Sequence, residues 1–336
     1  MNLFDNVILK TEIIDENPTF EMKKEDLHIA FGIDANFAIG MGVCMTSIAL
    51  HNQQEKINFH VFTDGIQAED FERLKQLTHY KNVKLIIYYI NKKVFEKFPT
   101  SVGWTYATYY RFIMGKVLYG QATKVLYLDA DVLCIGSLKE LIEIDMGNNT
   151  IIGICDFLEN FIVRMQELSI KNGKYFNAGV MYIDVERWCE DEISERAIQL
   201  LSKDPTKYKS LDQDVLNVLL DGKVKFVNKK WDYMYNTMRM KHALPNDTIL
   251  IHFTGDKPWQ SWTQHHFLAK YYMEYIQKSP WFNVKMREAS SYKEKRKLAR
   301  SYFRRQEYII AIQWYWKYLV ARQQKKIDYE VFYGYF

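Results

Sequence analysis

Two acidic residues follow directly after an apolar run in the middle of the chain. The run extends from Val125 to Leu128, and Asp129 and Asp131 come next at positions i and i+2. Side chains two positions apart in extended backbone lie on the same face, so both carboxylates can approach one cation. Hard divalent cations prefer such oxygen ligands. The spacing therefore indicates a metal site, with a solvated turn as the simpler alternative.

A second segment with candidate metal-binding and phosphate-binding residues lies much later in the chain, after another short apolar run. His252 provides an imidazole, Gly255 allows close approach of the backbone, and Lys257 provides a point charge for a phosphate. On its own, a histidine such as His252 is more often a hydrogen-bonded core residue. An imidazole beside two aspartates favours Mn²⁺ over Mg²⁺, because Mg²⁺ rarely takes nitrogen ligands. We therefore expect Mn²⁺, with Mg²⁺ as the alternative.

The elements that must position these residues alternate along the chain. Apolar runs predict strands at 27–33, 57–63, 83–90, 124–133, 151–157 and 177–185, and helical periodicity predicts helices at 41–50, 67–80, 105–118, 192–202 and 211–220. This alternation predicts an α/β architecture with a mainly parallel sheet. Ligands of such sheets gather where loops leave the carboxyl ends of the strands. Residues 1–26 are interpreted as a polar N-terminal leader.

Five segments in this order resemble the retaining family-8 glycosyltransferases, and within them the enzymes that build the lipopolysaccharide core. They are FGIDANF (31–37), TYATYYR (105–111), YLDADVL (127–133), YFNAGV (175–180) with LDQDVLN (211–217), and HFTGDKPW (252–259). The resemblance covers roughly 27–285 and implies a GT-A-type, Rossmann-like nucleotide-sugar-binding domain. It implies transfer of a hexose from a UDP-sugar to a lipopolysaccharide core sugar, with an α-linkage. Galactose is slightly favoured over glucose.

The resemblance also implies a role for each matching residue. Asp129, Asp131 and His252 would hold Mn²⁺ against the UDP diphosphate. The other donor-binding residues would be Ala130 beside the metal ligands, Gly32, Ile33, Asp34, Asn36 and Phe37 around the uridine, Asn177, Ala178 and Gly179 along the sugar, Arg111 at sugar hydroxyls or phosphate, and Gly255 and Lys257 at the diphosphate.

Simpler interpretations exist for several of these residues. Arg111 also fits an exposed arginine on a helix, and the segment 177–179 also fits a strand entry with a glycine bulge. Asp212 also fits the N-cap of a helix over 213–220. Asp156 has the weakest support of the residues expected to line the sugar.

Asp156, Asp212 and Gln213 are the candidate catalytic residues. Cleavage of the sugar–phosphate bond builds negative charge on UDP, which Mn²⁺ and Lys257 would stabilise. It builds positive charge on the sugar C1, which Asp212 or the carbonyl of Gln213 would stabilise. A covalent intermediate requires a nucleophilic carboxylate on the β-face, whereas the family position there is Gln213, a poor nucleophile. We therefore favour front-face attack, in which the departing phosphate takes the acceptor's proton.

The C-terminal tail, 286–336, has a different composition from the rest of the chain. From Lys285 to Lys326 there are 13 Lys and Arg against 3 Glu, so this segment has a charge of +10. Because the whole chain has a net charge of +4, the remainder carries −6. Cations beside residues such as Tyr302, Trp314 and Trp316 are typical of a helix at an anionic membrane surface. A tail helix docked on the core is the alternative. Nucleic acid is not an expected partner, because no motif for it is present.

Other features of the sequence limit the classes of function. The four cysteines are far apart and form no CxxC pair, which indicates buried thiols in a reducing compartment. The N-terminus does not resemble a signal peptide, and no run of 18 apolar residues is present. We expect a cytoplasmic protein, peripheral on the cytoplasmic face of the inner membrane. Its oligomeric state is left open.

Two other classes of function are the alternatives to a glycosyltransferase. A metal-dependent nucleotidyltransferase would carry a Gly-rich basic loop for a triphosphate, whereas FGIDANF has one glycine and no Lys or Arg. A non-catalytic membrane-surface adaptor would have no use for Asp129, Asp131 and His252 together.

Overall fold

The computed structural model describes the chain except for residues 1–2, 16–19, 101–104, 157, 237–241 and 334–336. The chain divides into two units. The first comprises residues 1–234, 242–252 and 278–281, and the second comprises residues 235–241, 253–277 and 282–336.

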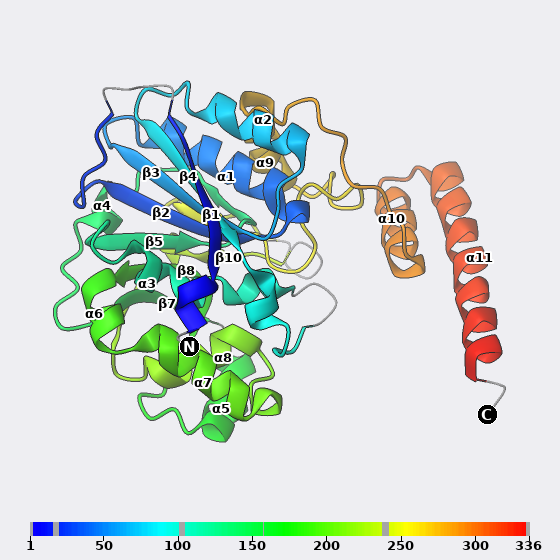
Figure 1. Cartoon of the computed structure of the whole chain (residues 1–336). Coiled ribbons are helices and arrows are strands. Elements are labelled where there is room, and N and C mark those ends of the chain that lie inside the picture. The colour runs from blue at the N-terminus through cyan, green and yellow to red at the C-terminus, as the bar shows by residue number, and fades with distance from the viewer. Residues whose placement is uncertain (1–2, 16–19, 101–104, 157, 237–241, 334–336) are drawn as a thin grey trace. The chain divides into compact units, whose positions relative to one another are not determined.

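An eight-stranded sheet forms the centre of the first unit (Figure 1), in the order β1-β4-β3-β2-β5-β8-β7-β9. Its strands are β1 (Ile8–Ile14), β2 (Leu27–Ile33), β3 (Ile57–Thr63), β4 (Val83–Ile90), β5 (Lys124–Leu128), β7 (Ile151–Cys155), β8 (Phe176–Asp184) and β9 (Val224–Val227). The neighbours β4–β3, β3–β2, β2–β5 and β7–β9 are parallel, and the other pairs are antiparallel. The predicted α/β class with a mainly parallel sheet is confirmed.

Helices cover the sheet, because its parallel strands are buried on both faces. Every residue of β3 is buried, and β2 is buried apart from the partly exposed Gly32. Gly42 allows its helix to contact Trp281, since a Cβ there would lie 2.1 Å from the indole Cζ3. The helices of this unit are α1 (Ala38–His51), α2 (Ala68–Leu77), α3 (Arg111–Leu118), α4 (Lys139–Ile142), α5 (Leu158–Leu168), α6 (Val185–Glu190), α7 (Ile193–Lys203) and α8 (Leu211–Leu219).

A second, three-stranded sheet of the first unit contains His252 and begins directly after Asp131. It consists of β6 (Val132–Cys134), β10 (Tyr233–Met234) and β11 (Leu250–His252), in the order β10-β11-β6. The sequence predicted one strand over 124–133, but the backbone leaves the large sheet after Leu128 and enters the small sheet at Val132. Val132 pairs with His252. The two aspartates therefore lie at the junction of two sheets, beside the end of β11.

The strand β1 was not foreseen, because residues 1–26 were interpreted as a polar leader. It forms the edge of the large sheet by antiparallel pairing with β4. Its sequence, ILKTEII, mixes charged with apolar residues, and Leu9 and Ile13 are exposed. An edge strand has only one paired side, so it does not need the continuous apolar run by which the inner strands are recognised.

The described helices of the second unit are α9 (Ala269–Lys278, whose last residue belongs to the first unit), α10 (Tyr292–Arg304) and α11 (Tyr308–Tyr333). Ser291 starts α10 with a capping box, in which its hydroxyl accepts from the Glu294 N–H while the Glu294 carboxylate accepts from the Ser291 N–H. Helices α10 and α11 pack side by side (Figure 1). The predicted helical C-terminal tail is confirmed. Among the described residues, no helix is long and apolar enough to cross a bilayer.

Candidate active site

Four neighbouring parallel strands bring charged side chains to the same end of the large sheet. This end, formed by the carboxyl ends of the strands and distinct from the edge strand β1, is called the sheet edge. Just beyond the carboxyl ends of β4, β3, β2 and β5 come Lys92, Asp64, Asp34 and Asp129, in that order across the sheet. Strand β8 runs antiparallel to β5 and therefore begins at the same edge, and Asp156 follows the end of β7 there. Such an edge is where α/β sheets bind their ligands.

Asp129, Asp131 and His252 converge, although His252 is far from the other two in the sequence. One potential ligand atom from each residue lies within 4.8 Å of the others. The Nε2 atom of His252 is 3.3 Å from Asp131 Oδ1 and 3.9 Å from Asp129 Oδ2. His252 and Asp131 are buried and Asp129 is half-buried. The structure thus brings the three predicted metal ligands together.

Space and charge at this cluster both suit a cation. A Cβ on Gly179 would lie 2.4 Å from His252 Cε1 and 2.7 Å from Asp129 Oδ2, so the glycine keeps the space beside the ligands open. Burial lowers the pKa of His252, but Asp131 and Asp232 raise it more, so that the net pKa is well above its ordinary value. The local field is therefore strongly negative. The oxygen and nitrogen donors fit a divalent ion such as Mn²⁺.

Asp129 is held so that one of its two oxygens remains available. Its Oδ1 accepts hydrogen bonds from the Tyr127 hydroxyl at 2.6 Å and from Arg111 Nη2 at 2.8 Å. Arg111 also donates to the Ala178 carbonyl at 2.6 Å, and its Nε pairs with Asp212 Oδ2 at 3.1 Å. Since Arg111 is buried, the alternative of an exposed surface arginine is wrong. The sequence predicted that Arg111 reaches sugar hydroxyls or phosphate; the structure shows it bound to two site carboxylates.

Helix α8 begins at the site with a strained residue. Leu211 has a φ of 49°, a left-handed conformation that is unusual for a bulky side chain. The N-cap is Ser210, so the interpretation of Asp212 as an N-cap is wrong. Instead, Asp212 Oδ1 accepts from the Thr108 hydroxyl at 2.6 Å. Burial raises the pKa of Asp212, and Arg111 opposes part of that rise.

The side-chain amide of Gln213 has a fixed orientation. Its Oε1 accepts from the backbone N–H of Ala178 at 3.0 Å, and its Nε2 donates to Asp156 Oδ2 at 3.2 Å. Asn177 Nδ2 donates to the same Asp156 oxygen at 3.2 Å, and Asn177 Oδ1 accepts from the Gly179 N–H at 2.8 Å. The structure therefore joins these five predicted site residues in one hydrogen-bonded network.

Asp214, which the sequence analysis did not select, fixes the start of α8 through its own set of buried hydrogen bonds. It is fully buried and accepts from the Tyr175 hydroxyl at 2.6 Å, from the Ser210 N–H at 2.8 Å and from the guanidinium of Arg164. It therefore ties the start of α8 to α5 and to the start of β8.

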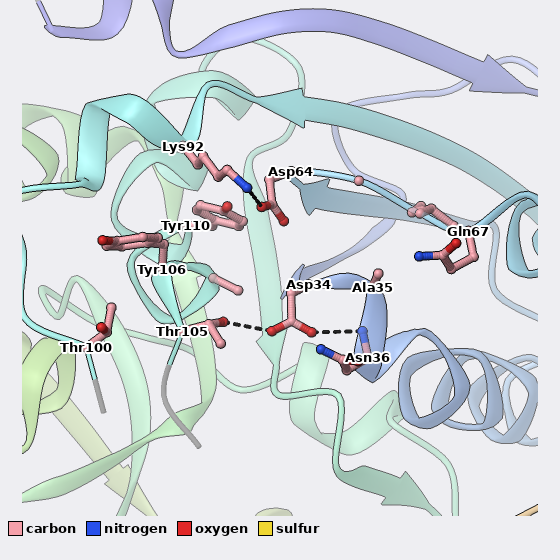
Figure 2. Close-up of a pocket in the computed structure, with 13 residues that line it drawn as sticks. Asp34, Ala35, Asn36, Asp64, Gln67, Lys92, Thr100, Thr105, Tyr106 and Tyr110 are labelled. Atoms are coloured by element: carbon pink, nitrogen blue, oxygen red, sulfur yellow. Dashed lines mark hydrogen bonds and ion pairs between the residues drawn. The ribbon is translucent and has the colours of Figure 1, made fainter. Parts of the chain in front are cut away.

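A pocket of about 490 Å³ lies at the ends of β2, β3 and β4 (Figure 2). Asp34 lies in it and accepts from the Asn36 N–H at 2.9 Å and from the Thr105 hydroxyl at 2.8 Å, and Lys92 pairs with Asp64 at 3.2 Å. Of the residues expected around uridine, Asp34 and Asn36 line this pocket, whereas Gly32, Ile33 and Phe37 are not among its lining residues. Gly32 instead faces Ala107 and Tyr110, and Ile33 is buried.

Gly255 and Lys257 belong to the second unit, and their assignment to the diphosphate stays a prediction. Gly255 has a φ of 83°, and a Cβ there would lie 3.1 Å from Asn236 Nδ2. Lys257 Nζ donates to the Phe253 carbonyl at 3.2 Å.

Sequence reasoning missed several residues that support the site. Tyr127 and Thr108 stand within the segments that carry the resemblance, so their position within a motif was the available signal of a role. Asp232 follows Lys-Lys-Trp and carries no such signal. It is fully buried, and its Oδ1 lies 3.0 Å from His252 Nδ1.

Comparison with known sequences decides the family. Residues 28–263 match glycosyl transferase family 8, and residues 268–322 match the C-terminal region of that family. The chain belongs to glycosyl transferase family 8.

Two curated relatives of this family-8 protein are similar over nearly their whole length. The lipopolysaccharide 1,3-galactosyltransferase of Salmonella typhimurium strain LT2 is 33% identical over 327 residues, which are 94% of this chain and 96% of the relative. The lipopolysaccharide 1,2-glucosyltransferase of Escherichia coli K12 is 30% identical over 301 residues, 86% of this chain and 88% of the relative.

A solved structure supports the fold of this family-8 chain. The galactosyltransferase LgtC, in complex with donor and acceptor sugar analogs, is 27% identical, with a TM-score of 0.63 over 75% of this chain and 96% of LgtC. The predicted GT-A-type fold is confirmed.

Proposed function

We propose that this protein is a retaining hexosyltransferase that moves galactose or glucose from a UDP-sugar to a sugar of the lipopolysaccharide core, forming an α-linkage. Its similarity to a lipopolysaccharide galactosyltransferase and a lipopolysaccharide glucosyltransferase supports both the acceptor and the class of donor. Galactose is slightly favoured, because it is the sugar in the name of the relative with 33% identity.

The convergence of Asp129, Asp131 and His252 at the sheet edge is the observation that carries this proposal. The pocket at Asp34 lies at the end of β2, and the aspartates follow the end of β5, the neighbouring parallel strand, so the pocket and the three ligands lie at adjacent strand ends. Asp129 Oδ2, Asp131 and His252 Nε2 would hold Mn²⁺, or Mg²⁺ as the alternative. A divalent ion bound there supplies Lewis-acid stabilisation of the leaving diphosphate.

The contacts of the catalytic candidates favour front-face attack. Both oxygens of Asp212 are already engaged, by Thr108 and by Arg111, so nucleophilic attack by Asp212 would have to break a buried ion pair. The Gln213 carbonyl oxygen accepts one hydrogen bond and retains a second lone pair. We assign Gln213 and Asp212 to stabilisation of positive charge at C1, and Asp156 and Asn177 to holding Gln213 and the sugar.

We also propose that the C-terminal helices bind the anionic cytoplasmic face of the inner membrane. Ile309, Ile312 and Trp316 are 77%, 68% and 67% exposed and lie on one stripe of α11, at helical spacing. Helix α10 carries the run KEKRK. Apolar and aromatic side chains next to clustered cations suit an interface of anionic lipid.

A panel of UDP-sugars tested with Mn²⁺ and truncated lipopolysaccharides examines the central proposal, with products assigned by NMR. We expect an α-linked hexose from UDP-galactose or UDP-glucose, and loss of transfer in Asp129→Ala or with EDTA. Asp191→Asn is a matched control, because Asp191 binds Thr150 and Lys223 instead of the site. A near-normal rate in Asp129→Ala would remove the metal assignment, and UDP binding that is indifferent to EDTA would favour a non-catalytic adaptor. A glycosyl–Asp212 adduct that turns over competently would refute front-face attack.

A further inference from the structure

We propose that Asp232 is a positioning residue for the metal site, whose carboxylate holds the His252 ring with Nε2 directed at the ion. The inference rests on the proposed metal-dependent function and goes beyond the three ligands themselves.

The pairing of β10 with β11 in the small sheet brings Asp232 close to His252. Strands β10 and β11 are parallel, with Met234 opposite His252. Asp232 lies directly before β10, and its backbone carbonyl accepts a hydrogen bond from the Met234 N–H at 3.0 Å. Asp232 Oδ1 consequently reaches His252 Nδ1 at 3.0 Å.

The two nitrogens of His252 face different partners. Nδ1 faces Asp232, whereas Nε2 faces Asp131 Oδ1 at 3.3 Å and Asp129 Oδ2 at 3.9 Å. A carboxylate accepts from the N–H on Nδ1 and so keeps the proton there, which leaves the lone pair of Nε2 for a cation. Carboxylates behind ligating histidines fix the tautomer and the ring orientation in this way.

A second buried aspartate in the same unit shows what a purely structural carboxylate requires. Asp214 is as buried as Asp232, but its oxygens are shared among Arg164, Tyr175 and Ser210. Asp232 binds His252 alone through Oδ1, and its Oδ2 has no hydrogen-bond partner among the described residues. Burying a carboxylate with one partner costs several kcal/mol that a structural cross-link would have to recover. A role through His252 on a bound cation accounts for that cost.

The affinity of the full-length chain for Mn²⁺ in the presence of UDP tests the inference. In Asp232→Asn the amide can donate to Nδ1, which moves the histidine proton to Nε2 and blocks it as a ligand. We expect the dissociation constant for Mn²⁺, measured by EPR titration, to rise about 10–100-fold. Asp191→Asn, the control, should match the wild type. Equal affinities in wild type and Asp232→Asn would overturn the inference.

A double-mutant comparison separates positioning from a general structural effect. In a His252→Ala background there is no ring to orient, so adding Asp232→Asn should not weaken Mn²⁺ binding further. An additional loss of the same size in both backgrounds would show that Asp232 acts on the fold, and would overturn the proposal. If the wild type binds no Mn²⁺ at all, it is the proposed function that fails.

One measurement needs no variant and so does not depend on how Asp232→Asn folds. With ¹⁵N-labelled histidine, the pulsed-EPR spectrum of Mn²⁺ bound to the wild type should show coupling to a directly ligated histidine nitrogen. Binding of Mn²⁺ without that coupling would overturn the inference, even if hexosyl transfer proceeds.

Discussion

The sheet edge of the first unit and the α10–α11 helices of the second unit both concentrate charge. At the sheet edge several charged side chains are buried and paired, whereas on the helices many side chains are exposed. At the sheet edge, Arg111 and Asp212 are buried, and each has partners at hydrogen-bond distance. On α11, side chains such as Ile312 and Trp316 are largely exposed. The segment 285–326 carries +10, whereas the remainder of the chain carries −6.

This difference separates charged groups that are paired inside the protein from side chains that are exposed to solvent. Buried ion pairs fix the geometry of the sheet edge, and the second oxygen of Asp129 lies beside Asp131 and His252. Exposed cations beside exposed apolar residues gain little from each other in water. They gain more at a surface that is both anionic and apolar. Buried, paired charges are typical of an active site, whereas exposed cations beside apolar side chains are typical of a surface that binds a membrane.

The largest expected effect comes from filling the space beside the metal ligands. Gly179→Ala places a Cβ 2.4 Å from His252 Cε1 and 2.7 Å from Asp129 Oδ2, so at least one ligand must move. A displacement of about 1 Å at reacting groups costs on the order of 100-fold in rate. We expect kcat for hexosyl transfer to fall by at least that factor, measured with saturating UDP-sugar and Mn²⁺.

Gly136→Ala is the control for this variant. Its added Cβ would meet the flexible end of the Ile249 side chain at 2.7 Å, away from the ligands. It should retain most of the wild-type rate. Comparable activity in Gly179→Ala and Gly136→Ala would contradict the tight packing of the cluster.

The second effect distinguishes the exposed surface from the buried site. Ile312→Glu combined with Trp316→Glu places two acids on the apolar stripe of α11. Burial of one such side chain contributes about 1.5–3 kcal/mol, so we expect binding to anionic phospholipid vesicles to weaken at least about 10-fold. Transfer to a water-soluble acceptor should be unchanged.

A matched control for the vesicle experiment is Val163→Glu on α5, where the valine is 66% exposed. This variant should co-sediment with vesicles like the wild type. Equal co-sedimentation of the α11 variant and the wild type would refute membrane attachment through α11.

A smaller effect tests whether the buried partners of Asp129 contribute to chemistry. Tyr127→Phe removes a hydrogen bond of 2.6 Å to Asp129 Oδ1. Hydrogen bonds to charged groups contribute about 1.5–3 kcal/mol, so we expect kcat/KM to fall by roughly 10-fold or more. Tyr182→Phe, on the neighbouring strand β8, is the control. If both variants keep full activity, the orientation of Asp129 does not depend on Tyr127.

The sequence predicted the parts of this molecule that carry local signals. Strands β2 and β3 follow from runs of mostly apolar residues, and Asp129 with Asp131 follows from a motif at the end of such a run. His252 lies 121 positions after Asp131, so its link to the aspartates rested on its ligand chemistry and on the resemblance and not on local spacing. The break of the predicted strand at Asp129 was not foreseen, because apolar residues resume at Val132 and Leu133.

What the sequence did not show depends on register between distant strands. Asp232 meets His252 only because β10 pairs with β11 in one alignment, and no local pattern specifies that alignment. The partners of Arg111 were missed for a similar reason. Its guanidinium reaches Asp129 and Asp212 across three elements, and a sequence predicts the charge of an arginine but not its direction.

The smallest effect concerns a buried pair of histidines in the core of the first unit, away from both charged regions. His28 Nδ1 lies 2.9 Å from His60 Nε2, and His60 Nδ1 lies 3.1 Å from the Tyr88 hydroxyl. Burial lowers the pKa of both histidines, and for His60 the neighbouring His28 adds to the shift. The unfolded chain therefore binds protons that the folded chain does not, as pH falls through about 6.5. Folding stability should be independent of these groups above that pH and should decrease below it.

The difference in slope between wild type and His60→Asn measures this contribution. We expect the free energy of unfolding, from urea titrations at pH 7.5 to 5, to fall more steeply in the wild type, by up to about 1.4 kcal/mol per pH unit. The raised pKa of His252, which burial opposes and Asp131 and Asp232 produce, has the opposite sign. It is present in both proteins and cancels in the difference. His79→Asn, at an exposed histidine, should leave the slope of the wild type unchanged. Identical slopes in wild type and His60→Asn would mean that the buried pair accepts its proton in the folded state as easily as in water.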